Sequence, residues 1–98
     1  MNPNLMRQAR ELEAKLAKAQ QELEKATVEA STGGGAVKIV ITGQQKVLKV
    51  SISTEAVDPS AVDLLEDLVL TAVNDAIARS QELAKQKLGS VAGFKLPF

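Results

Sequence analysis

Histidine, cysteine, tryptophan and tyrosine are absent from this 98-residue chain, whose aromatic residues are limited to Phe94 and Phe98. Without thiols or imidazoles the chain has no disulfide, no zinc site of the usual kind and no histidine general base. Because no aromatic ring precedes residue 94, a base-stacking platform for single-stranded nucleic acid is disfavoured. We therefore predict that the protein is not an enzyme and that it uses no cofactor, metal or small-molecule substrate.

Long apolar runs are also missing. No stretch approaches the roughly 18 apolar residues of a membrane span, and the N-terminus lacks the basic-then-apolar pattern of a signal peptide. Apolar residues nevertheless make up 45% of the chain, a share that is normal for a folded domain and too high for disorder. We expect a single domain over residues 1–98, located in the cytoplasm and not bound to a membrane.

The charge of the chain is balanced in total but uneven along its length. The 12 Lys and Arg residues equal the 12 Asp and Glu residues in number, and this zero net charge argues weakly against a general polyanion binder. Residues 1–25 carry +1, residues 26–53 carry +2 and residues 54–98 carry −3, with four bases against one acid in residues 79–98. The balance therefore limits where a polyanion could touch the protein and does not exclude one.

The N-terminal segment has the periodicity of an amphipathic helix over about residues 3–25. Apolar residues recur at alternating spacings of four and three, at Leu5, Ala9, Leu12, Leu16, Ala19 and Leu23. Asn2 followed by Pro3 is typical of an N-cap and a first helical position. This heptad seam either packs on the helix's own domain or also meets a partner helix, and the periodicity leaves both interpretations open.

Residues 26–53 switch to the alternation of half-buried strands. Gly33-Gly34-Gly35 and Gly43-Gln44-Gln45 separate three short alternating runs, which predicts a three-stranded antiparallel meander. One face of this sheet is expected to be mostly polar, with Val40 and Val47 as its apolar exceptions. The other face is expected to be aliphatic and consists of Val28, Val37, Ile39, Ile41, Leu48, Val50 and Ile52.

A second, broader apolar stripe predicts a helix over about residues 61–88, followed by a tail over residues 89–98 without periodicity. Asp58-Pro59-Ser60 supplies capping chemistry, and Ser60 with Asp63 matches a capping box. Gly89 is well placed to end the helix. The predicted fold class is α+β, with the meander between two long helices.

The two helices are longer than the sheet on which they have to pack. A helix of about 23 residues is about 35 Å long and one of about 28 residues about 42 Å, whereas strands of roughly six or seven residues span about 20–23 Å. Parts of both apolar stripes must therefore overhang the sheet, and a large uncovered stripe is unusual on a soluble monomer. We predict a homodimer with projecting helical arms.

Two features that could indicate catalysis have simpler explanations. Gly33-Gly34-Gly35 leads into a strand and lacks the Lys-Ser/Thr pair and the helix that a phosphate-binding loop requires. Asp63, Glu66 and Asp67 occupy the first turns of a helix, where the dipole favours acids. We interpret the glycines as a hairpin turn and the acids as a solvated face.

Basic residues on the helices are the candidates for DNA binding. On a monomer they are explained as solvated charges or as partners of the helix ends. In a twofold dimer each cluster appears twice, so two basic arm tips could straddle a duplex and contact its phosphates. The candidates are Arg7, Arg10, Lys15 and Lys18 on the first helix and Lys85 and Lys87 near the end of the last.

Four segments in order along the chain resemble the YbaB/EbfC family of bacterial nucleoid-associated proteins. Asn4-Leu5-Met6-Arg7-Gln8-Ala9 is similar to the family's opening Asn-Leu-Met-Lys-Gln-Ala, and Gly33-Gly34-Gly35-Ala36-Val37-Lys38-Ile39 to its Gly-x-Gly-x-Val-Lys-Val. Residues 65–69 with 72–76 resemble its last helix, and Gly93-Phe94-Lys95-Leu96-Pro97-Phe98 resembles its ending, Gly-Phe-Lys-Met-Pro-Phe. The likeness spans essentially the whole chain.

The resemblance implies a small cytoplasmic homodimer, shaped like tweezers, that associates with the nucleoid, binds double-stranded DNA, changes its conformation and affects gene expression. It implies no catalytic residue and no cofactor, and it places DNA contacts on the arms, at Arg7 and Arg10. Lys85 and Lys87 follow from the charge pattern alone. The alternative is a homodimeric protein–protein adaptor that uses the helical seam and the face with Val40 and Val47, with DNA binding incidental.

Overall fold

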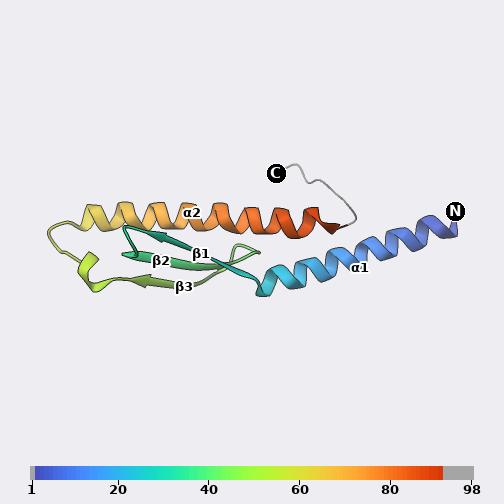
Figure 1. Cartoon of the computed structure of the whole chain (residues 1–98), viewed down its shortest axis with the longest axis horizontal. Coiled ribbons are helices and arrows are strands. Elements are labelled where there is room, and N and C mark those ends of the chain that lie inside the picture. The colour runs from blue at the N-terminus through green and yellow to red at the C-terminus, as the bar shows by residue number, and fades with distance from the viewer. Residues whose placement is uncertain (1, 92–98) are drawn as a thin grey trace.

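The computed structural model describes residues 2–91, in which a three-stranded sheet joins two long helices (Figure 1). Helix α1 spans Pro3–Lys25, and the strands are β1 (Thr27–Thr32), β2 (Val37–Thr42) and β3 (Val47–Ile52). A short 3-10 turn, η1 (Thr54–Ala56), leads to helix α2 (Val62–Gly89). The α+β class and the expected order of elements are confirmed. The predicted family ending, residues 93–98, lies outside the described residues.

The sheet is antiparallel throughout, in the order β1-β2-β3, and α2 lies along one of its faces (Figure 1). Helix α2 packs on β1 and β2, where small Ala72 and Ala76, one turn apart, let it approach the branched side chains of β2. Val28 is partly buried against the same core. The fully buried apolar cluster consists of Ala30, Val37, Ile39, Ile41, Ala72 and Ala76.

Helix α1 is an arm that projects beyond the sheet, and the chain measures 69 × 22 × 17 Å (Figure 1). The Asn2 side chain caps its start by accepting the Asn4 N–H at 2.9 Å, as the sequence predicts. Only the end of α1 next to the sheet is buried, at Ala19 and Leu23, whereas Leu5 near the tip is 60% exposed. The apolar stripe of α1 therefore overhangs the domain, as the helix length predicts.

Strand β3 departs from the simple alternation. Lys49 pairs with Val40 in the regular register, and a register shift after this pair makes Val47 the cross-strand partner of Ile41. Because cross-strand partners share a face, Val47 lies on the face that carries α2, and its predicted place beside Val40 is wrong. Since α2 packs on β1 and β2, the β3 residues expected on the aliphatic face are largely exposed, at 55% for Leu48, 52% for Val50 and 42% for Ile52. Val47 is also exposed, at 46%.

The start of α2 also differs from expectation. Ala61 is the N-cap residue and no side chain caps this end, so the predicted capping box of Ser60 and Asp63 is wrong. Ser60 instead donates its hydroxyl at 2.7 Å and its N–H at 2.9 Å to the Asp58 carboxylate. These hydrogen bonds lower the pKa of Asp58 below its ordinary value. The local turn around Asp58 thus uses the hydroxyl that a capping box would need.

Candidate nucleic-acid interface

All four predicted bases of α1 are exposed along the projecting arm. Arg7 and Lys18 are about three helical turns apart and share a face, which is opposite the apolar stripe that ends at Leu23. Arg10 and Lys15 flank that face on its two sides. None of the four forms an ion pair within residues 2–91, so their charges are available to an anion.

The basic character of the arm is concentrated at its tip. Four glutamates reduce the charge of residues 1–25 to +1, and all four lie at position 11 or beyond. Residues 1–10 contain Arg7 and Arg10 and no acid. The free end of the arm is therefore the part of α1 that would attract a phosphate most strongly.

The predicted bases of α2 lie beside the root of the arm and differ in their surroundings. The Lys87 ammonium lies 3.9 Å from the Glu22 carboxylate of α1, so this charge links the two helices. Lys85 is exposed and forms no ion pair within residues 2–91. The structure thus pairs Lys87 with α1 and leaves only Lys85 open to a ligand.

The direction of the arm is set by contacts around Thr42, the last residue of β2. Its hydroxyl accepts the backbone N–H groups of Gln44 at 3.2 Å and Lys46 at 3.1 Å, which closes the β2–β3 turn. Gly43 then lies against the arm, because a Cβ atom added there would be 2.5 Å from Leu23 Cδ2. The root of the arm therefore packs so closely on this turn that a Cβ atom at residue 43 would force Leu23 to shift.

The predicted set of basic residues omits two exposed lysines on the sheet. Lys38 of β2 and Lys49 of β3 lie on the face opposite α2, since Lys38 stands between the buried Val37 and Ile39, and Lys49 pairs with Val40. The strand alternation, together with the charge of +2 over residues 26–53, was the sequence signal that could have identified them.

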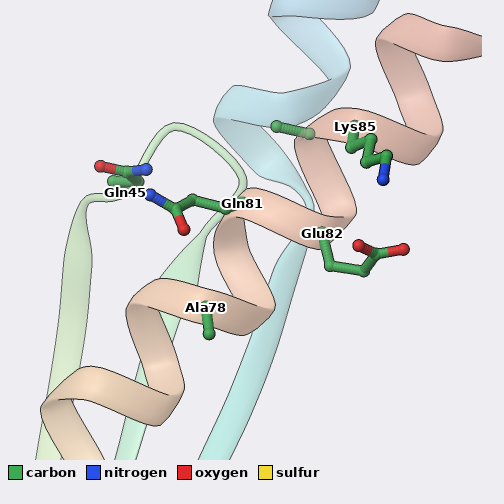
Figure 2. A pocket seen from close by; sticks show the side chains of 6 residues that line it. Gln45, Ala78, Gln81, Glu82 and Lys85 are labelled. Atoms are coloured by element: carbon green, nitrogen blue, oxygen red, sulfur yellow. The ribbon is translucent and has the colours of Figure 1, made fainter. Parts of the chain in front are cut away.

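A hollow lies beside α2, next to the β2–β3 turn. Figure 2 shows this hollow, in which Gln81 extends toward Gln45, whereas Glu82 and Lys85 extend away from that turn. Within residues 2–91 no group of three or more Asp or Glu side chains is arranged to hold a metal ion. No helix in the same range combines the length and apolar character needed to cross a membrane.

The fold and the basic arm define a class of small helix–meander–helix proteins. The chain belongs to the YbaB/EbfC DNA-binding family, whose model matches residues 1–94. It is 47% identical over 90 residues to a nucleoid-associated protein of Syntrophobacter fumaroxidans, and the aligned region covers 92% of this chain and 82% of that protein. A nucleoid-associated protein of Ruminiclostridium cellulolyticum is 44% identical over 90 residues, and the aligned region covers 92% of this chain and 78% of that protein.

The architecture also recurs in a solved structure. The chain is similar to an uncharacterized protein from Helicobacter pylori, with a TM-score of 0.75 over 88% of this chain and 91% of that one. The sequence identity of the pair is 15%, so this likeness concerns the fold alone.

Proposed function

We propose that the protein is a non-catalytic, nucleoid-associated protein of the cytoplasm that binds duplex DNA as a homodimer, alters its conformation and thereby affects gene expression. Membership of a family described as DNA-binding supports DNA as the partner, and the names of the relatives support the nucleoid location. The observation that carries the proposal is the tip of the arm, where Arg7 and Arg10 are exposed without an ion pair in the described part of the chain.

The proposed homodimer is built on β3. This strand is at an edge of the sheet, so its outer backbone N–H and C=O groups have no neighbouring strand within residues 2–91. An exposed edge with four aliphatic side chains, Val47, Leu48, Val50 and Ile52, is prone to pair with another chain. Twofold pairing with the β3 of a second copy would continue the sheet and shelter these side chains.

The proposed DNA contacts are mainly to phosphates. The arm carries Arg and Lys side chains and no aromatic residue, and most hydrogen bonds between proteins and DNA go to phosphate oxygens and sugars. Two arms in one dimer would hold the same duplex at two places, which is how the dimer would alter DNA conformation. Such binding depends strongly on salt and little on sequence.

Two measurements test this function. Titration of a fluorescently labelled duplex with the purified protein at about 50 mM salt, where phosphate contacts are strong, should give saturable binding. Light scattering at micromolar concentration should give the mass of two chains. Absence of duplex binding at this salt contradicts the DNA-binding function, and the mass of one chain contradicts the homodimer.

One observation favours a second function. Leu5 and Leu16 lie on the arm with 60% and 39% of their surface exposed, and such a seam is suited to a partner helix. In this alternative the homodimer is a protein–protein adaptor and DNA binding is weak or incidental. A dimer of the expected mass that binds no duplex at about 50 mM salt would favour the adaptor.

A further inference from the structure

The face of the sheet opposite α2, here called the open face, carries two lysines on adjacent strands. Lys38 pairs across the strands with Ser51, and Lys49 is two residues before Ser51 on β3. The two lysines are therefore diagonal neighbours, with Cα atoms about 7–8 Å apart. Both are exposed, and neither forms an ion pair in the part of the chain that the structure describes. Their charges face solvent side by side.

Short side chains surround these lysines. Ser31 on β1 and Ser51 on β3 stand on either side of Lys38, and both lysines line one shallow hollow together with Ser51, Ser53 and Gly35. The short neighbours leave the lysine side chains standing above the surface, and the serine hydroxyls are hydrogen-bond donors that suit phosphate oxygens.

One acid shares the open face. Glu29 of β1 lies opposite Val40 and lines the same hollow, and it is the only acid in residues 26–53. Glu29, Val40 and Lys49 are cross-strand neighbours on the three strands, so Val40 lies between the acid and this lysine. The Glu29 carboxylate forms no ion pair with either lysine. The two lysines therefore outnumber the single acid, and the open face keeps an excess of positive charge.

We propose that the open face binds the phosphate backbone of duplex DNA, with Lys38 and Lys49 as the charged contacts. The inference rests on the proposed DNA-binding function and adds a surface to the arms. Lysines are flexible point charges that suit phosphates, and their diagonal spacing is comparable to that of successive phosphates in one strand. The shallow hollow has no aromatic side chain on which a base could stack, which favours a backbone contact over a free nucleotide.

The proposed dimer enlarges this surface. Lys49 lies on β3, the strand that would pair with its counterpart, so the lysines of two protomers would lie on one continuous face across the twofold axis. A duplex lying on this face would meet both pairs of lysines at once.

The test compares four proteins in the same duplex titration across a salt series. The double variant Lys38→Gln with Lys49→Gln should bind about tenfold or more weakly at about 100 mM salt, with a salt slope that is less steep by about 0.9 for each phosphate that it no longer neutralises. Glu29→Gln should bind more tightly, because it removes the acid beside the contact. Lys46→Gln is the matched control, since Lys46 does not line the hollow, and it should leave the slope unchanged.

The outcomes separate this proposal from the function on which it rests. Steep, salt-dependent binding by the wild type, with unchanged affinity and slope for the lysine double variant and unchanged affinity for Glu29→Gln, would overturn the open-face contact and leave the arms as the site. A wild-type protein that binds no duplex would overturn both. The mass of each variant by light scattering should remain that of the wild type, because none of the substituted side chains lies on the aliphatic face of β3.

Discussion

The Ser80 hydroxyl lies 2.6 Å from the Thr42 carbonyl oxygen, and this hydrogen bond joins α2 to the end of β2 at the root of the arm. Both residues are buried, Ser80 completely. A hydroxyl on the buried stripe of a helix is tolerated because its donor has a partner. The turn on which the arm packs is thus held to α2 by a directed polar contact, in addition to the apolar packing of Leu23 against Gly43.

We expect Ser80→Ala to destabilise the protein by about 1–2 kcal/mol, because the buried Thr42 carbonyl would lose this donor. Urea unfolding at one fixed protein concentration measures the change, since stability depends on concentration in a dimer. Ser31→Ala, at an exposed position on the sheet, is the control and should change stability by less than about 0.5 kcal/mol. Equal effects of the two substitutions would show that the hydrogen bond contributes nothing specific.

Gly43→Ala should destabilise the protein by about 1–3 kcal/mol, because its methyl group would overlap Leu23, whose Cδ2 lies 2.5 Å from the added Cβ. Leu23→Ala is itself destabilising, because Leu23 is buried, but the cost of Gly43→Ala should be smaller in that background, since the Cδ2 atom is then gone. The double-mutant cycle in urea unfolding measures this coupling. Additive effects would mean that the turn and the arm adjust independently.

Val50→Lys should convert the dimer to single chains at about 10 µM, because the charge would be buried without a partner between two β3 strands. Val50 is 52% exposed in the protomer, so the fold itself should tolerate the lysine. Val57→Lys is the matched control, an exposed valine outside the sheet, and should leave the mass unchanged. Sedimentation equilibrium measures both, and a dimeric Val50→Lys would place the interface elsewhere.

Arg7→Glu with Arg10→Glu should weaken duplex binding and leave the dimer intact, because the arm tip would repel the phosphates it now attracts. The neutral pair Arg7→Gln with Arg10→Gln should give an intermediate affinity, which separates removal of the positive charge from repulsion by a negative one. Fluorescence anisotropy at fixed salt measures all three proteins. Unchanged affinity in both variants would remove the arm tip from the site.

Local periodicity predicts the elements and most of the core. The four-and-three spacing of α1 and the alternation of Val37, Ile39 and Ile41 each report on a single segment, and the structure agrees with both. The register shift in β3 could not be predicted, because it depends on pairing with β2. The exposure of Val50 likewise depends on which strands α2 covers, a packing choice that no single segment encodes.

The candidate site likewise has features that local sequence predicts and features that depend on packing. Exposure of Arg7 and Arg10 was predictable, since both lie off the apolar seam of their own helix. The pairing of Lys87 with Glu22 was not, because the two residues are far apart in sequence and meet only when α2 folds back along α1. Local patterns therefore identify exposed charges, and packing decides which of them remain available to a ligand.

The salt dependence of the wild-type affinity for duplex DNA shows whether the dimer binds DNA through phosphate contacts. If Arg7 and Arg10 of both protomers each contact a phosphate, the logarithm of the association constant should fall with the logarithm of salt concentration with a slope of about −3.6 or steeper. A slope near zero, or no binding at about 50 mM salt, would contradict binding through phosphate contacts.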